Sequence, residues 1–400
     1  MSMKKPLSYQ HTIYTCFGGS ATQATVNNFV PLLFVTFSTQ FSIPLDQIAL
    51  LASINFITQL IVDICAPKVC SKIGLRACVV LSQVFVAAGL IGLAVLPAIL
   101  PLPYLGLALS VILYACGGGL VEVFVSPIVQ ACPSKHKQAT MGLLHSFYCW
   151  GQVFVVLAST AFFFFFHISN WFILAVLWAI LPILDAICFA IVPIPALTED
   201  GSQGLKPRQL LQSKTFLLAV LAMMGAGACE MAMAQWASAF AETGLHVSKT
   251  VGDIAGPCAF AVLMGLSRVV YAKLSQQIHL NKMMTLSGGI CVLGYLLAAL
   301  SPWAAGGLVG CALCGLGVGI MWPGTLSLTA EKMPAGGASM FAGLALAGDI
   351  GCVCGPALVG LMSRVTGELK TGMLLSIIFP ITLTIAVYFI TRRGAQLSSD

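Results

Sequence analysis

The sequence has very few charged residues. Asp, Glu, Lys and Arg make up 8% of its 400 residues and hydrophobic residues 58%, and the mean hydropathy is +0.97. Soluble domains are about one quarter charged, so this chain cannot cover a soluble globule with polar side chains. The shortage excludes soluble enzymes, disordered regulators and nucleic-acid-binding proteins, despite a net charge of +6. It predicts a polytopic membrane protein.

Patterns typical of catalysis, metal binding and secretion are also missing. Most of the 15 cysteines lie inside apolar runs, and the pair Cys311 and Cys314 has no second pair and no nearby His. Buried cysteines in this setting act as small apolar residues, so we expect neither a disulfide framework nor a metal site. Without a nucleophile–base pair or a soluble domain, we expect no enzyme and no cofactor. No small-residue cleavage site closes the first apolar run, so no cleavable signal peptide is expected.

Long apolar runs recur along the whole chain. A bilayer core requires about 20 apolar residues per helix, and runs of this length do not alternate as β-barrel strands do. The sequence therefore predicts an all-α membrane protein with twelve transmembrane helices. The expected spans are 10–38, 46–66, 76–98, 103–131, 138–165, 170–194, 214–241, 250–272, 281–301, 304–331, 336–363 and 370–391.

The basic residues are distributed unevenly between the two sides of these spans. Sixteen of the 19 Lys and Arg residues fall on one side, and only Lys249, Arg364 and Lys370 fall on the other. Cytoplasmic loops carry the excess of Lys and Arg, so both termini are expected in the cytoplasm of a multi-pass inner (plasma) membrane protein. The longest polar connector divides the chain into an N-terminal six-helix half (1–194), a cytoplasmic linker (195–213) and a C-terminal six-helix half (214–400).

The two halves contain similar stretches about half the chain apart. Gly119 and Glu122 lead down span four to Pro133, and Gly319 and Trp322 lead down span ten to Pro334. Two six-helix repeats joined by a loop are typical of carriers whose halves rock about a central site.

Three helices carry motifs that resemble one family. Span four reads GGGLVEVFVSP over 117–127, span five reads LLHSF over 143–147, and span ten reads MWPGT over 321–325. The chain thereby resembles the fucose permease branch, sugar:proton symporters, of the major facilitator superfamily. The loop sequence KIGLR over 72–76 is similar to the end of that superfamily's loop signature.

The resemblance implies alternating access and a proton-carrying glutamate at Glu122. The family pairs this glutamate with an aspartate on its first helix, in an Asn-Asp context, where this sequence has Asn27-Asn28. An amide cannot carry a proton, so the family's two-carboxylate coupling through helices one and four cannot operate here.

Four acids lie well inside the expected spans: Glu122, Asp185, Glu230 and Asp349. No Lys or Arg is expected at comparable depth, and an isolated carboxyl in a membrane takes up a proton, binds a cation or borders water. We expect Glu122, Glu230 and Asp349 to act in proton coupling; a protonated acid bonded to a neighbouring helix is the structural alternative. Asp185 is expected to be structural. His145 is the further coupling candidate, because its expected depth matches that of Glu122.

Polar side chains in the spans are the candidates for solute binding. Ser20, Gln23 and Asn27 have helical spacing and share one face of span one. Together with Asn28, and with Gln235 and Trp322 in the other half, they form the expected solute site, near mid-membrane between the halves. Hydrogen bonds between helices are the alternative role for the amides.

These features predict a secondary active transporter for proton-coupled symport of a small polar solute, such as a sugar or related metabolite. A proton-antiport exporter of drugs or metabolites is the alternative, and a sensor or scaffold that has lost transport is a third class. The expected partners are the solute, a proton (sodium is the alternative ion) and the lipid bilayer, with no nucleic acid. The protein is expected to be monomeric.

Overall fold

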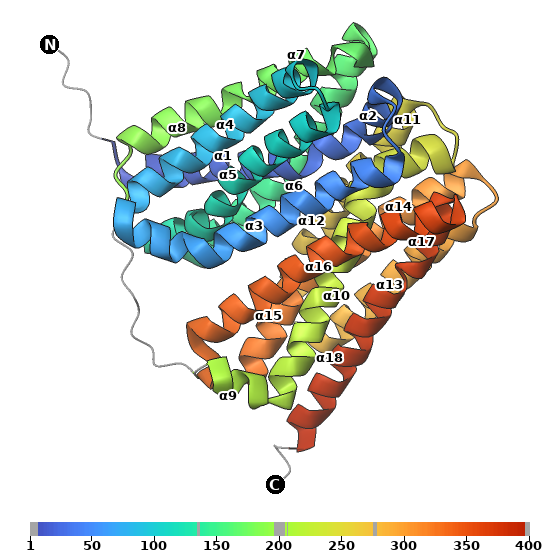
Figure 1. Cartoon of the computed structure of the whole chain (residues 1–400). Helices are drawn as coiled ribbons and strands as arrows, with labels where there is room; N and C mark the ends of the chain where they lie inside the picture. The colour runs from blue at the N-terminus through green and yellow to red at the C-terminus, as the bar shows by residue number, and fades with distance from the viewer. Residues whose placement is uncertain (1–6, 134–136, 196–204, 206, 275–277, 397–400) are drawn as a thin grey trace, which may run out of the picture. The chain divides into compact units, whose positions relative to one another are not determined.

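The computed structural model describes residues 7–133, 137–195, 205, 207–274 and 278–396, which form helices and no β-strand (Figure 1). The all-α prediction is therefore confirmed for the described residues. In chain order the α-helices are α1 (Tyr9–Asn28), α2 (Phe34–Phe41), α3 (Leu45–Ile73), α4 (Leu75–Ile99), α5 (Pro103–Ala131), α6 (Lys137–Phe166), α7 (Trp171–Trp178), α8 (Ile180–Ile191), α9 (Pro207–Gln212), α10 (Lys214–Ala239), α11 (Lys249–Asp253), α12 (Ala259–Leu274), α13 (Leu280–Leu300), α14 (Ala304–Val318), α15 (Met321–Lys332), α16 (Gly337–Thr366), α17 (Leu369–Leu375) and α18 (Ile378–Gln396).

Eleven helical segments in the described part of the chain are long and apolar enough to cross a membrane. The first expected span, 10–38, does not belong to this set. It is divided into α1 and α2 by a 3₁₀ turn, Val30–Leu33, in which Pro31 cannot donate to an α-helical ladder. The polar face of α1 also lowers its hydropathy. The fold nevertheless has a helix for every predicted span.

Local sequence signals explain several helix ends. The Ser213 hydroxyl accepts a hydrogen bond from the backbone N–H of Phe216 at 3.3 Å and so caps α10. Gly367, with a φ of 77°, occupies the left-handed conformation that ends α16. Gly74, with a φ of 84°, allows the abrupt turn from α3 to α4.

The chain divides into two compact units. Residues Met1–Ile43 and Ile57–Asp200 belong to the first unit, and Pro44–Phe56 and Gly201–Asp400 belong to the second. The expected boundary at the linker 195–213 stays a prediction, because much of that linker lies outside the described residues.

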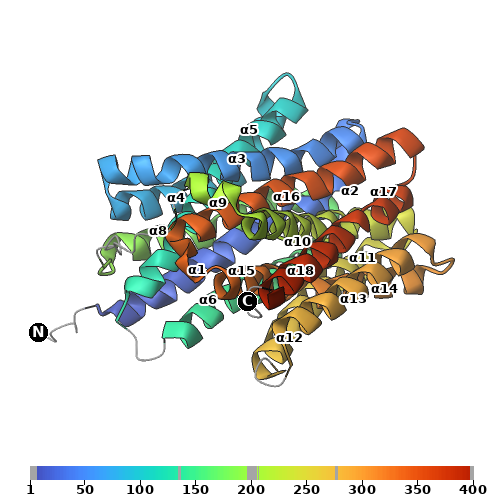
Figure 2. The ribbon, with the colours of Figure 1, turned by 90° about the horizontal axis from the view of Figure 1, so that it is seen from below.

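Helix pairing is the same within each unit. In the first unit α1 packs on α6 and α8, while α4 packs on α5 and α8. In the second unit α10 packs on α16 and α18, while α13 packs on α14 and α18 (Figure 2). Each pairing in the first unit therefore has its counterpart about 200 residues later, as the internal sequence repeat predicts.

Glycines allow these helices to approach closely. A methyl group on Gly117 of α5 would meet the backbone of Ser82 and Val86 on α4. In the second unit, Gly227 of α10 lies against the carbonyl of Gly348 on α16. Membrane helices gain stability from such close backbone packing. Lipid tails are as apolar as the side chains, so the hydrophobic effect does not drive these helices together and van der Waals contact has to.

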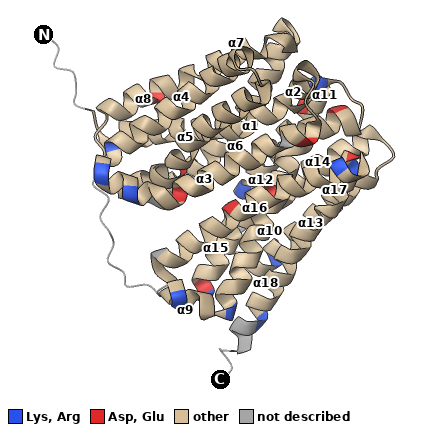
Figure 3. Ribbon diagram, viewed as in Figure 1, with Lys and Arg blue, Asp and Glu red and all other residues tan. Residues whose placement is uncertain are grey.

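Charge is confined mainly to helix ends, as Figure 3 shows for the connection between α3 and α4. Most of each long helix carries no Lys, Arg, Asp or Glu. The few acids that do lie within helices therefore stand out as candidate functional groups.

Candidate functional site

A chain of hydrogen-bonded side chains crosses the first unit. Glu122 Oε2 accepts from Gln23 Nε2 at 3.2 Å, and the same amide nitrogen donates to Gln59 Oε1 at 2.7 Å. Gln59 Nε2 donates to Asn27 Oδ1 at 2.9 Å, and Asn27 Nδ2 donates to Tyr148 Oη at 3.4 Å. We call these five residues the amide chain. It connects four helices: α5, α1, α3 and α6.

Helical spacing places two members of the amide chain on the same face of α1. Gln23 and Asn27 are four residues apart, and both bond to Gln59, which confirms that they share a face. The neighbouring Asn28 instead donates to the Ala24 carbonyl of its own helix at 2.9 Å. Ser20 is buried on the same helix, one turn before the amide chain. Whether Ser20 and Asn28 contact solute stays a prediction.

The glycine run of α5 makes room for the amide chain. A methyl group on Gly118 would lie 2.8 Å from Gln23 Oε1 and 3.5 Å from Gln59 Cδ. Only a residue without a side chain allows α5 to come this close to two amides. The close approach of α5 to these amides therefore explains why a glycine stands at position 118 within the run 117–119.

One atom in this chain has no partner. Both hydrogens of the Gln23 amide are used, one toward Glu122 and one toward Gln59, whereas Gln23 Oε1 is buried without a hydrogen-bond partner in the described part of the protein. A buried amide oxygen without a donor is costly. At Gln23 the N–H donors of the side-chain amide are therefore satisfied and its oxygen acceptor is not.

The environment of Glu122 differs from the expectation. Gln23, Gln59 and Asn27 are 4–6% exposed, whereas Glu122 is exposed. The expectation of a buried carboxyl is therefore wrong for Glu122: a polar chain leads from the interior of the unit to an accessible acid. His145 is also exposed, on α6, and its predicted communication with Glu122 stays a prediction.

In the second unit Glu230 is the more buried of the two coupling candidates, with 7% of the residue exposed on α10. The guanidinium of Arg268 on α12 interacts with it electrostatically, and Arg268 Nε donates to the Gly319 carbonyl at 3.1 Å. No ion pair within 4 Å joins Glu230 to a Lys or Arg among the described residues. Its role in proton coupling stays a prediction.

The remaining predicted residues of the second unit lie on α10, α15 and α16. Trp322 is half-buried and its indole ring packs directly against Gly348, the residue before the half-buried Asp349. Gln235 on α10 is 2% exposed. Their roles in solute binding or proton coupling stay predictions.

Asp185 forms a separate polar feature in the first unit. It is 6% exposed, its Oδ1 lies 2.6 Å from the position that a methyl group on Gly18 would take, and its Oδ2 has no partner among the described residues. Gln83 on α4 approaches the adjacent Gly19, at 3.7 Å from the same kind of position. Asp185 does not belong to the amide chain.

Sequence reasoning missed Gln59 and Tyr148. A signal for Gln59 was present, because Asn55, Gln59 and Asp63 follow one another at four-residue intervals and so share a face of α3. Tyr148 lies next to the LLHSF motif, but nothing in the sequence indicates its partner.

Comparisons with known proteins agree with this architecture. A family model described as Major Facilitator Superfamily matches residues 15–356. The Membrane protein MosC of Rhizobium meliloti is 24% identical over 205 residues, so the match spans half of this chain and half the length of MosC.

Several solved structures share the fold. The fucose:proton symporter FucP of E. coli matches with a TM-score of 0.67 and 18% identity over 96% of this chain and 99% of FucP. A D-xylose-proton symporter gives 0.77 and 12% identity over 96% of each chain. A bacterial homologue of the human lysosomal transporter Spinster gives 0.77 and 12% identity over 97% of this chain and 98% of that one.

Proposed function

This chain belongs to the Major Facilitator Superfamily, and we propose that it is a secondary active transporter that carries a small polar solute together with a proton. The solved sugar:proton symporters of the same fold favour a sugar or a related metabolite as the solute. The observation that carries the proposal is the amide chain, which joins one accessible carboxyl to a tyrosine hydroxyl through three buried amides.

Glu122 is the proposed proton carrier. It is exposed in the described structure and accepts a hydrogen bond from Gln23, so a proton bound there would act directly on the amide chain. Position 28 is an asparagine, so helix α1 supplies amides rather than a second acid. On this proposal one carboxyl of the first unit carries the proton.

Protonation of Glu122 changes what Gln23 must offer. An ionised carboxylate accepts hydrogen bonds only, whereas a protonated carboxyl can donate one. Turning the Gln23 amide would present Oε1, the atom that now has no partner, to the new O–H group. The oxygen would then accept from Glu122 and face Gln59, while the Nε2 group would take the position where Oε1 now has no partner.

The turn of one amide requires the others to follow. With Gln23 reversed, its oxygen would face Gln59 Oε1, so Gln59 must turn to donate, and Asn27 must turn in the same way. The Tyr148 hydroxyl then changes from acceptor to donor, since a hydroxyl can act as either. Because Tyr148 is half-exposed, we infer that it presents a different hydrogen-bonding group to a solute in the two protonation states of Glu122.

The test begins with identification of the solute. Thermal stability of the purified full chain is measured against sugars, nucleosides, amino acids and organic acids, because a ligand of the folded state raises stability by mass action. The best ligand is then used for uptake and efflux assays in proteoliposomes with an imposed pH gradient, which also determine the direction of transport.

The decisive variant is Glu122→Gln. Its side-chain oxygen can still accept from Gln23, so folding and solute exchange should survive, while accumulation driven by the pH gradient should be lost. The matched control is Glu331→Gln, at an exposed glutamate that pairs with Lys332 at the end of α15. Undiminished accumulation by Glu122→Gln would remove Glu122 from the coupling mechanism.

A further inference from the structure

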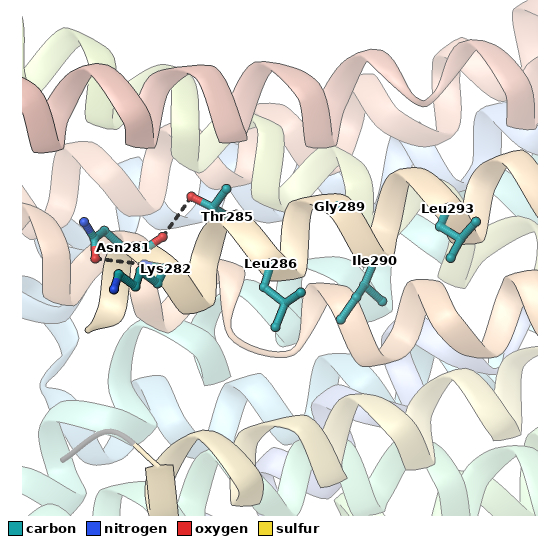
Figure 4. Close-up of a pocket in the computed structure, with 7 residues that line it drawn as sticks. All are labelled: Asn281, Lys282, Thr285, Leu286, Gly289, Ile290 and Leu293. Carbon is teal, nitrogen blue, oxygen red and sulfur yellow. Dashed lines mark hydrogen bonds between the residues drawn. The ribbon is translucent and has the colours of Figure 1, made fainter. Parts of the chain in front are cut away.

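One face of α13 carries an open groove of about 660 Å³ (Figure 4). Its polar end is formed by Asn281, Lys282 and Thr285. Beyond them, Leu286, Gly289, Ile290 and Leu293 continue the groove along the helix. The four-residue spacing keeps these residues on one side of α13, and none of them belongs to the amide chain or to the other candidate residues.

The apolar part of the groove has open space beside exposed aliphatic side chains. A methyl group on Gly289 would meet no heavy atom within 4 Å, so the surface of the helix is uncovered at this point. Leu286 and Leu293, on either side, are 64% and 51% exposed. In Figure 4 the side chains of Leu286 and Ile290 point the same way from the ribbon, so the glycine lies beside a wall of aliphatic side chains.

The polar end of the groove carries the positive charge of Lys282. Lys282 is exposed, and the sequence has no Asp or Glu between positions 254 and 330. Lys273 lies in this acid-free stretch, and Arg392 lies on α18, which packs against α13. Asn281 Oδ1 accepts from the backbone N–H of Lys282 at 2.8 Å, so its amide N–H groups face away from that bond.

We propose that this groove binds an anionic phospholipid. The lipid phosphate would be held by the Lys282 ammonium and the Asn281 amide, and an acyl chain would lie over Gly289 between the exposed leucines. Basic clusters at the membrane surface attract anionic lipids, and the distribution of Lys and Arg predicts that this end of α13 faces the cytoplasm, where such lipids are abundant.

The experiment uses the purified full chain and native mass spectrometry. Phosphatidylglycerol and phosphatidylcholine with identical acyl chains are supplied at equal concentration, and the ratio of bound lipids is measured. We expect preferential retention of phosphatidylglycerol. Lys282→Gln should lower this preference by about fivefold, the equivalent of one basic side chain near a membrane surface.

Two further variants separate a shaped site from diffuse attraction. Lys273→Gln removes the same charge from the same acid-free stretch but lies outside the groove, and it should have a clearly smaller effect. Gly289→Leu fills the open space and should lower phosphatidylglycerol retention while Lys282 is kept. Glycerol phosphate, which has no acyl chain, should not displace the lipid.

Equal effects of the two lysine variants would overturn the proposal in favour of diffuse charge attraction. Unchanged lipid retention in Gly289→Leu, or displacement by glycerol phosphate, would show that the groove itself does not hold the acyl chain.

Discussion

Two buried glutamines in the first unit should respond differently to the same substitution. Gln59 is 4% exposed, and its side chain accepts from Gln23 and donates to Asn27. Gln83 is fully buried, and neither atom of its side-chain amide has a partner within the described residues. Methionine keeps the length of either side chain and removes its hydrogen-bonding groups, so the pair isolates the contribution of the bonds.

Gln59→Met should destabilise the protein by about 2–4 kcal/mol. Hydrogen bonds between membrane helices contribute about 0.6 kcal/mol each on average, and Gln59 makes two of them. A buried group that loses its partner adds about 1–3 kcal/mol, and Asn27 Oδ1, in a residue 6% exposed, loses the Gln59 donor. Gln83→Met removes no protein–protein hydrogen bond, so it should be neutral or stabilising.

The measurement is reversible unfolding in mixed detergent micelles, with both variants compared with the parent protein. A difference of about 1.4 kcal/mol corresponds to a tenfold change in the unfolding equilibrium, well within reach of such titrations. The reasoning fails if Gln83→Met costs as much as Gln59→Met, because the two side chains would then be equally well bonded. It also fails if Gln59→Met is neutral.

Three further predictions concern packing and charge. Gly117→Ala should cost about 1–3 kcal/mol, because its methyl group meets backbone atoms, whereas Gly289→Ala, with open space at its methyl group, should be neutral or slightly stabilising in the same unfolding assay. Trp236→Phe should destabilise by about 1–3 kcal/mol, because it removes the 3.1 Å bond from Nε1 to the buried Pro356 carbonyl; equal stability would contradict this. Lys249→Met removes the cation that contacts two carboxylates, so its loss of stability should be greater at pH 8 than at pH 5, where protonation of Glu242 removes part of the negative charge left without its cation. A deficit independent of pH would refute that explanation.

The transmembrane helices could be predicted because lipid leaves so few alternatives. Backbone groups in a bilayer must bond within their own helix, so an apolar run of sufficient length predicts the element directly. The expected span 103–131 matches α5 (Pro103–Ala131) at both ends. The shared face of Gln23 and Asn27 was equally accessible, since it depends only on helical spacing within one segment.

Partners and exposure could not be predicted in the same way. The contact between Gln59 and α1 joins positions 32 and 36 residues apart, and the bond from Asn27 to Tyr148 joins positions 121 apart. Such contacts depend on how helices rotate against one another, which spacing within a helix does not determine. Glu122 is exposed and Glu230 is buried although both occupy similar sequence settings, because neighbouring helices decide which face water reaches.

The proposed coupling does not require the second carboxyl that Asn28 replaces, because the amide chain can act as a two-state element. If a single amide in the chain turned alone, one junction would place two oxygens or two N–H groups against each other. A lost buried hydrogen bond costs about 1–3 kcal/mol, so mixed orientations of Gln23, Gln59 and Asn27 are rare, and the chain is populated in either of its two uniform orientations.

A ligand shifts such an equilibrium by its difference in affinity for the two states. The proton on Glu122 favours the reversed orientation, in which Gln23 Oε1 gains a donor. In the present orientation Asn27 donates to the Tyr148 hydroxyl at 3.4 Å, so the hydroxyl hydrogen is free to donate outward. A solute that accepts a hydrogen bond from Tyr148 would therefore favour the present orientation. The sign of the coupling therefore depends on whether the solute donates to Tyr148 or accepts from it, and ligands that differ only in that group should bind with opposite dependence on pH.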